Sequence, residues 1–355
     1  MTPIQSVSIA CRVVMDLHAL NNEGNESNRL MTRQVGIVTS GKDENNAPGY
    51  RRDVVNAISG DMSKHIFADH FRNIASDMKL PLNPASQALD PARIMGDERF
   101  ADWVKGEAED QDAKPDVHEV IDMLLTCSLT DVCGILITAG GQSIKRKSAV
   151  EFGWTVGLPE ITQVEEFIHA RHAVTRLTRT KAGQGATEEE KTAAADEKSA
   201  NIGQMIFNRP ASSGVYAFVA HLDVGAIGFN DATQRYPEEV SGFDVDRALR
   251  MRAALLALVQ TVIHPKGALT STQLPHVVDV DGIISTSGSA VAAPLISPLK
   301  DDYIEQAERV AGSLNSLYPN ANVLVHRFSG PDGMLAQMGQ VLDGAEPGSY
   351  VRYNA

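Results

Sequence analysis

Residues 7–17 alternate in character at every position, and this alternation constrains the fold more than any other feature of the chain. Successive side chains of a strand point to opposite faces, so the pattern predicts a β-strand with one buried face. One face would carry Val7, Ile9, Cys11, Val13, Met15 and Leu17, and the other Ser8, Ala10, Arg12, Val14 and Asp16. The chain is therefore expected to contain a sheet that packs on one side.

The other predicted elements indicate an antiparallel sheet with helices packed against it. Apolar periodicity predicts further strands over residues 32–38, 132–138, 149–158, 214–224 and 322–328. Helices are predicted over residues 53–78 and 245–263, with Asp244 as a candidate N-cap of the second. The strands follow one another in hairpin-like patterns rather than in repeated strand–helix units. This order favours an α+β fold, of which a ferredoxin-like core is the simplest version.

Two segments break the periodic pattern and are predicted to be insertions into that core. Residues 79–116 contain Pro81, Pro84 and Pro91, which break the preceding helix, and are expected to be irregular or weakly helical. Residues 160–212 include AGQGATEEEKTAAADEKSA, an alanine-, glycine- and glutamate-rich stretch of the kind that protrudes from a core.

The charge of the chain limits the functions that it can have. Its 355 residues carry a formal net charge of −13, and an acidic protein repels phosphate over long range. A nucleic-acid-binding role therefore requires a locally basic groove. Acidic residues are concentrated between positions 97 and 122, which contain ten acidic and three basic residues. This composition is typical of a solvated insertion.

Neither a membrane nor an oxidising compartment is indicated. No apolar run approaches the roughly 18 residues of a membrane span, and the N-terminus lacks the pattern of a signal peptide. Three cysteines without a CxxC pair argue against a disulfide framework or a zinc site. We therefore expect a cytoplasmic protein.

Two groups of small polar residues are candidates for ligand contacts. The run LNNEGNESNR, residues 20–29, follows the first strand and is too polar for a core. In the predicted helix over 53–78, a stripe opposite the apolar face consists of Asn56, Ser59, Gly60 and Ser63. Lys64 beside this stripe is able to contact a phosphate. The alternative, favoured by this helix alone, is close packing against another element.

A third candidate is a basic region in this acidic protein. Four acidic residues share its span, which is nevertheless net positive. Its cations are Lys145, Arg146, Lys147, Arg171, Arg176, Arg179 and Lys181. The sequence KRK follows GGQSI and is typical of a loop that meets phosphates, although most charge runs only solubilise a loop.

No catalytic or metal-binding pattern is evident. AGGQS lacks the third glycine of a dinucleotide-binding loop, and GKDENNAPG lacks the Gly-Lys-Ser/Thr ending of a phosphate-binding loop. His169 and His172 are three residues apart without a further ligand cluster, which leaves zinc as an open alternative. The first strand also lacks the aromatic stacking positions of an ordinary RNA-recognition module.

Four stretches together resemble one protein family. They are SVSIACRVVMDLHALNNEGNESNRLMTRQVGIV (6–38), VVNAISGDMSKHIFADHF (54–71), CGILITAGGQSIKRKSAVEFGWTVGLPE (133–160) and IGQMIFNRPASSGVYAFVAHLDVGAIGFN (202–230). They resemble the backbone subunit of type I CRISPR Cascade complexes, which is the CRISPR-associated protein seven family in its DevR-type autoregulator branch. The resemblance extends to about residue 275 and does not include the acidic segment.

The resemblance implies a modified ferredoxin-like, or RRM-like, palm with an antiparallel sheet and with finger and thumb insertions. The palm would consist of residues 1–78, 117–159 and 213–355, the finger of 79–116 and the thumb of 160–212. Such subunits polymerise along CRISPR RNA as a helical filament in antiviral defence. They hold the sugar–phosphate backbone while the guide pairs with target DNA, so aromatic stacking positions are not required.

Carried onto this chain, the resemblance implies a set of RNA-binding residues. They are Asn21, Asn22, Asn28, Arg29, Arg33, Asn56, Ser59, Gly60, Lys64, Lys145, Arg146, Lys147, Arg176, Met205, Phe207 and Arg209. Met205 and Phe207 are candidates for wedging against a displaced base, and core packing at the base of the thumb is their alternative.

The implied partners are CRISPR RNA, target DNA through the guide, adjacent copies of the chain and other Cascade subunits. Catalytic residues, metals, cofactors and membrane contacts are not expected. Two competing hypotheses stay open. One is a metal-dependent nuclease on a ferredoxin-like scaffold that uses Asp16, His18 or Glu23, and the other is a structural oligomer without nucleic acid.

Overall fold

The computed structural model describes residues 2–26, 29–42, 48–107, 114–139, 141–172, 204–236 and 245–350. Within these ranges, side chains are described except at 2, 25, 26, 29, 42, 48, 142, 169–172 and 204–207. No helix in the described part of the chain is long and apolar enough to cross a membrane.

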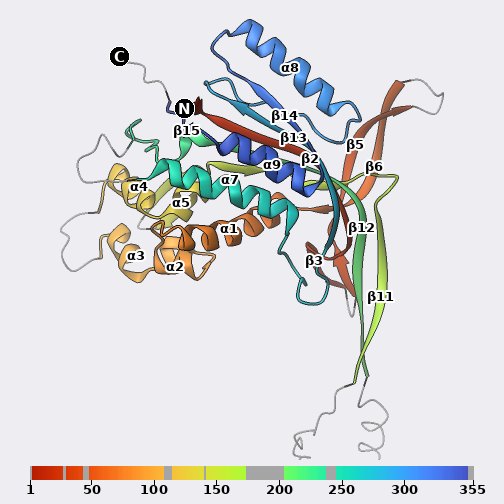
Figure 1. Ribbon diagram of the computed structural model, residues 1–355. Helices are drawn as coiled ribbons and strands as arrows, with labels where there is room; N and C mark the ends of the chain where they lie inside the picture. Colours follow the sequence, from red (N-terminus) through yellow and green to blue (C-terminus); the bar gives the residue numbers. More distant parts are fainter. Residues whose placement is uncertain are drawn as a thin grey trace, which may run out of the picture.

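A large, mainly antiparallel sheet forms the centre of the molecule (Figure 1). Neighbouring strands follow the order β14 (Leu324–Ser329), β13 (His276–Ser287), β2 (Ser6–His18), β12 (Gln204–Asp223), β10 (Thr155–Gly157), β6 (Pro48–Ile58) and β5 (Gln34–Lys42). Off this path, β12 also pairs with β9 (Val150–Phe152), β11 (Gln163–His172) and β4 (Arg29–Thr32), and β4 pairs with β3 (Asn22–Glu26). The predicted mixed fold with an antiparallel sheet is confirmed.

Helices cover both faces of the central strands. One face packs against α1 (Gly60–Asp77), α7 (Arg247–Ile263) and α9 (Gly330–Leu342), and the other lies under α8 (Tyr303–Leu317). The main core joins the odd-numbered side chains of β2 to Phe67 and Phe71 of α1 and to the apolar face of α7. A short parallel pair, β1 (Thr2–Ile4) with β15 (Ala345–Pro347), brings the two ends of the described chain together.

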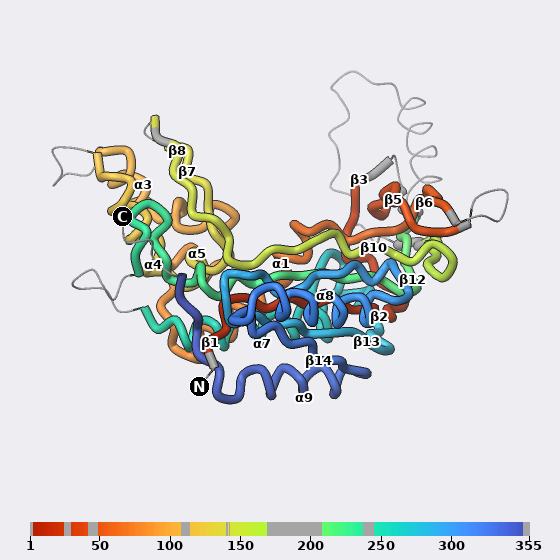
Figure 2. The backbone as a smooth tube through the Cα atoms, turned by 90° about the horizontal axis from the view of Figure 1, so that it is seen from above, coloured from red at the N-terminus to blue at the C-terminus, as the bar shows by residue number. Residues whose placement is uncertain are grey.

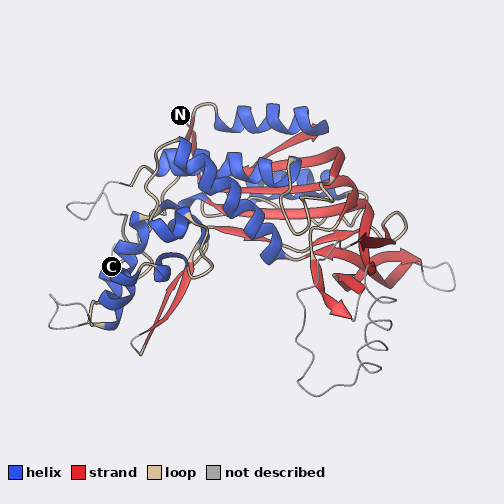
Figure 3. Ribbon diagram, turned by 90° about the horizontal axis from the view of Figure 1, so that it is seen from below, coloured by secondary structure: helices blue, strands red, loops and turns tan. Residues whose placement is uncertain are grey.

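A helical unit with its own small core lies at one end of the sheet. It contains α2 (Pro84–Gln87), η1 (Arg93–Gly96), α3 (Glu98–Lys105), α4 (Val117–Thr126), α5 (Ser128–Cys133), β7 (Ile135–Ala139) and β8 (Gln142–Arg146). Phe100 and Val104 pack there with Leu124, Ile137 and Ile144. The β7–β8 hairpin and β3 lie at opposite ends of the sheet and project to the same side of it (Figure 2). In the view from below, the hairpin is the pair of strands at the lower left (Figure 3).

Strand β2 was predicted with one buried face, and this is correct only for its second half. Val7, Ile9 and Cys11 face the helices as expected, but Ser8 and Ala10 on the opposite face are also buried, at 1% exposure each. The cause is coverage by α8 and the segment before it, because Ser8 Oγ donates a hydrogen bond to the carbonyl of Ala293 at 3.0 Å.

Leu17 also departs from the predicted face, since its side chain is 47% exposed and its φ is +55°. At this point the register with β12 shifts between Ser212 and Gly214, and the Leu17 amide donates to Ser213 Oγ at 3.0 Å. Bulges of this kind bend a strand and redirect the side chains beside it.

The helix predicted over 53–78 is wrong in its first part, which belongs to β6. Val54, Val55 and their neighbours pair with β5 from Gln34↔Asn56 to Lys42↔Pro48, and the helix begins only at Gly60 after the N-cap Ser59. β-Branched residues fit both patterns, and pairing with a second strand decided between them. Similarly, α7 begins after the N-cap Asp246, while Asp244 lies outside the described residues.

Candidate nucleic-acid interface

The loop after β2 and the end of β6 form a buried polar network beneath the start of α1. Asn21 Oδ1 accepts a hydrogen bond from the Ser59 amide at 2.7 Å. Asn56 Nδ2 donates to the Arg33 carbonyl at 3.0 Å, and Asn56 Oδ1 accepts from the Tyr216 hydroxyl at 3.1 Å. Asn21, Ser59 and Asn56 were all predicted to contact RNA. The structure brings them together, but Asn21 and Asn56 are buried at 8% and 4% exposure and hold the scaffold.

Ser59 and Gly60 act at the N-terminus of α1 rather than within a helical stripe. Ser59 Oγ accepts the Met62 amide at 3.2 Å and caps the helix. A Cβ on Gly60 would lie 2.8 Å from the Phe152 carbonyl oxygen, so the helix passes close to the backbone of β9. Ser63 is buried as well. The packing alternative therefore explains Gly60 and Ser63.

We expect Gly60→Ala to lower the free energy of unfolding by about 1–3 kcal/mol, because the added methyl must displace the Phe152 backbone. Gly312→Ala in α8 is a matched control, since a Cβ there meets nothing within 4 Å. That control should gain up to about 1 kcal/mol from better helix propensity. Urea denaturation measures both, and equal effects of the two substitutions would contradict the close approach.

His18 lies in the same region and is 2% exposed. Its ring packs edge-on against Tyr216, with 4.9 Å between ring centroids. Within the described part of the chain, neither ring nitrogen has a hydrogen-bond partner. Desolvation lowers the pKa of His18 to about 4 and raises that of Tyr216. The imidazole is therefore neutral at neutral pH and unsuited to contact with phosphate.

Arg33 and Glu23 meet at the open side of this network. Arg33 Nε lies 3.5 Å from Glu23 Oε1, and the Arg33 guanidinium lies 5.8 Å from the centroid of the Trp154 ring. Trp154 is 42% exposed. Glu23 thus partly neutralises Arg33, while the planes of Arg33 and Trp154 form a surface that a base or a ribose is able to cover. Trp154 was not among the predicted residues, because the alternation over 149–158 groups it with the apolar side chains Phe152 and Val156.

A group of cations lies where β8 leaves the helical unit. Lys145 and Lys147 are exposed, and Lys147 Nζ pairs with Glu151 at 3.0 Å. Lys64 on α1 is half-buried, and desolvation lowers its pKa, with Arg93 and Glu151 among its charged neighbours. Helix α1 thus brings Lys64 near residues that are 29 or more positions away in sequence. Lys64, Lys145 and Lys147 remain candidates for phosphate contacts.

Arg146 was predicted to contact RNA, but the structure buries its side chain in an ion-pair network. Its side chain is 0% exposed, whereas the neighbouring residues Lys145 and Lys147 are exposed. Its Nη2 donates to Asp131 Oδ1 at 2.6 Å and its Nη1 to Asp231 Oδ2 at 3.0 Å. Strand alternation places Arg146 on the face opposite Lys145, and the buried carboxylate of Asp131 holds it there.

The remaining predicted residues are described only in part. Asn22 begins β3 and is half-buried. Asn28 and Arg176 lie outside the described residues, and only the backbone of Arg29, Met205 and Phe207 is described. Arg29 is paired in parallel with Asn208, so β4 lies beside the N-terminal part of β12.

Arg209 lies at the base of the long β11–β12 hairpin. Its Nη1 donates to Thr272 Oγ1 at 3.1 Å. With Leu17, Phe167 and His276 it lines a cavity of about 330 Å³. Leu17 reaches this cavity through the bend at the end of β2, which sequence periodicity did not reveal.

In the described part of the chain, no three histidine, cysteine or acidic side chains come close enough to hold a metal. Asp16, His18 and Glu23 therefore do not assemble as the metal site that a nuclease would need. Instead, His18 is buried and Glu23 faces Arg33.

Comparison with known proteins gives a consistent result. A family model described as "CRISPR-associated negative auto-regulator DevR/Csa2" matches residues 9–308. A "CRISPR-associated protein Cas7/Cst2/DevR" of Methanocaldococcus jannaschii is 27% identical over 87% of this chain and 89% of its own. A "CRISPR-associated aCascade subunit Cas7/Csa2 2" of Saccharolobus solfataricus is 23% identical over 76% of this chain and 75% of its own. Among solved structures, a chain of a "CRISPR RNA-guided surveillance complex, pre-nicking" has a TM-score of 0.45 at 11% identity. That match covers 94% of this chain and 99% of the other.

Proposed function

Because the chain belongs to the CRISPR-associated DevR/Csa2 family, we propose that it is a non-catalytic backbone subunit of a type I Cascade complex. In this role it binds CRISPR RNA in the cytoplasm through the sugar–phosphate backbone. Adjacent copies line up along the guide beside other Cascade subunits. The guide bases then select target DNA by pairing, so the protein itself needs no base-specific contacts.

We further propose that the central strands form a ferredoxin-like palm. Two features support this. The order β13–β2–β12–β9 is antiparallel throughout, and α1 and α7, which connect these strands, lie on one face. The finger, expected over 79–116, would on this proposal extend to residue 146, because the small core of the helical unit joins its early helices to the β7–β8 hairpin. Residues 160–212 would form the thumb, with Met205 and Phe207 at a displaced base.

The observation that carries the RNA-binding proposal is the group formed by Lys64, Lys145 and Lys147. In a chain of net charge −13, Lys145 and Lys147 are exposed at the end of the β7–β8 hairpin, and Lys64 shares Glu151 with Lys147 as a charged neighbour. Ammonium groups that approach from separate elements are suited to follow phosphates whatever the base sequence. Arg33 with Trp154 extends this surface toward β3.

We expect the double substitution Lys145→Glu, Lys147→Glu to weaken binding of a single-stranded guide equally for all guide sequences. Each lost phosphate contact should also make the plot of log affinity against log salt shallower by about 0.7. Fluorescence anisotropy over a range of salt concentrations measures both effects. Lys300→Glu, Arg309→Glu near α8 is the matched control.

An unchanged salt dependence in the double variant would show that Lys145 and Lys147 do not contact the phosphates of the guide. The same protein incubated with guide and Mg²⁺ or Mn²⁺ should leave the RNA intact. Cleavage that Asp16→Ala abolishes would instead support the nuclease hypothesis.

A further inference from the structure

The hairpin β5–β6 extends past the helix layer and leaves one of its faces open (Figure 1). Alternate residues of the two strands lie on this open face and are exposed, namely Gln34, Gly36, Val38, Ser40, Tyr50, Arg52 and Val54. Tyr50 is 84% exposed, Val54 69% and Val38 64%. Large side chains at such exposure on one flat face mark an interaction surface.

Charge is divided between the two faces of this hairpin. On the opposite face, Arg51 Nε pairs with Asp53 Oδ2 at 2.9 Å and Arg51 Nη1 with Glu160 Oε1 at 3.3 Å, so both carboxylates are neutralised there. Among the described side chains of the open face, Arg52 is the one charged group and no acid accompanies it. The open face is thus complementary to a polyanion even though the chain is acidic.

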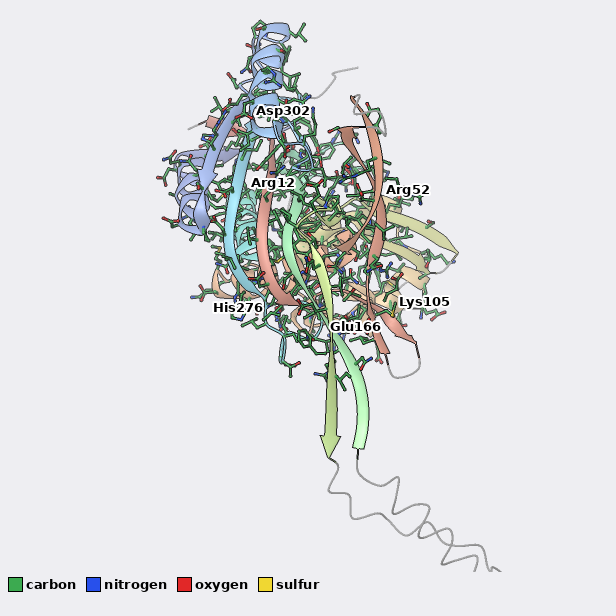
Figure 4. All side chains as sticks on the ribbon, turned by 90° about the vertical axis from the view of Figure 1, so that its right-hand side faces the viewer. Arg12, Arg52, Lys105, Glu166, His276 and Asp302 are labelled. Carbon is green, nitrogen blue, oxygen red and sulfur yellow. The ribbon has the colours of Figure 1, made fainter. Side chains whose placement is uncertain are left out.

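The position of Arg52 explains a glycine in the neighbouring strand. A Cβ at Gly36 would lie 3.3 Å from Arg52 Nη2 and 3.4 Å from Nε, so the guanidinium lies across this glycine. Arg52 and Tyr50 are both exposed, and Figure 4 labels Arg52 on β6. Two planar groups therefore occupy alternate positions of one strand, roughly 6.8 Å apart along it.

We propose that the open face of β5–β6 is a stacking platform for single-stranded nucleic acid, with one base on Tyr50 and the next on Arg52. This inference rests on the proposed function, which supplies guide RNA as the strand. The face ends at the pair Gln34↔Asn56, and Asn56 bonds to the carbonyl of Arg33, so the platform lies next to the surface of Arg33 and Trp154. Stacking on planar side chains tolerates every base, as a subunit that serves any guide requires.

Fluorescence titration of the full chain with a single-stranded RNA that contains 2-aminopurine tests this platform. Tyr50→Ala should weaken binding about tenfold with an unchanged salt dependence, while Tyr50→Phe should bind as the parent does. Arg52→Lys should keep the salt dependence yet lose affinity, because it retains the charge but not the plane. Tyr318→Ala, an exposed tyrosine after α8, is the matched control and should bind as the parent does.

The outcomes separate this platform from the lysine track, by which we mean the proposed phosphate contacts of Lys64, Lys145 and Lys147. If Tyr50→Ala and Arg52→Lys bind normally while the Lys145, Lys147 double variant does not, the platform is wrong and the proposed function stands. The reverse result supports the platform and overturns the lysine track. Failure of the parent to bind any single strand overturns both. Reduced self-association in sedimentation at unchanged RNA affinity would assign the face to a second copy, against this proposal.

Discussion

Replacing Asp131 by alanine is expected to lower the free energy of unfolding by about 3–5 kcal/mol, because Arg250 would stay buried without a counter-ion and Arg146 would keep only the partly exposed Asp231. Asp131 Oδ1 accepts from Arg146 Nη2 at 2.6 Å and its Oδ2 from Arg250 Nη1 at 2.6 Å. The three side chains are 0–1% exposed, and the Gly228 amide also donates to both carboxylate oxygens at 3.0 Å. Guanidinium chloride denaturation measures the loss.

Asp302→Ala is the control for this prediction. Asp302 pairs with Arg309 at 3.1 Å and with Lys300 at 3.4 Å, but it is 51% exposed. Exposed pairs contribute about 0–1 kcal/mol, so this substitution should change stability little. A loss of less than about 1 kcal/mol in the Asp131 variant would mean that water reaches the two arginines in its place.

The second large effect is a loss of stability on acidification that depends on His18. Burial lowers the pKa of His18 from 6.5 to about 4, so the native state binds fewer protons than the unfolded state between these values. Stability is therefore fully present above pH 6.5 and is lost as the pH falls toward 4. The His18 contribution to this loss should be about 3 kcal/mol.

This contribution is measured as the difference between the parent and His18→Gln in the pH dependence of urea denaturation. The comparison is necessary because burial also lowers the pKa of His70, His221 and His326, which act in the same direction. His276→Gln, which removes an exposed imidazole from β13, is the control for the substitution itself. Parallel curves for His18→Gln and the parent would mean that the ring is solvated in the native state.

The candidate site illustrates why a sequence pattern identifies a region before it identifies contacts. Asn21, Asn56 and Ser59 were selected as small polar groups free to meet RNA, and they do gather at one point. However, buried amides must be satisfied within the protein, and their partners turned out to be a carbonyl, a hydroxyl and a helix amide. Lys145 and Lys147, by contrast, are exposed in the structure.

Arg146 shows the same limit for charge. In sequence it belongs to the basic run KRK, where all three residues look alike. Its burial depends on Asp131, fifteen positions earlier, which also binds Arg250 of α7, and on Asp231. Likewise, the aromatic positions that the first strand lacks occur as Tyr50 on β6 and Trp154 before β10, and the end of β6 had been assigned to the helix over 53–78.

By itself, the sequence determined the strand β2, the mixed fold with an antiparallel sheet, and the family. These depend on local periodicity and on ordered motifs, both of which are written along the chain. Only the tertiary structure decided that α8 buries the second face of β2, that residues 53–58 are strand rather than helix, and which cations stay exposed. The reason is physical, because burial and strand pairing depend on partners that are distant in sequence, and no local pattern specifies them.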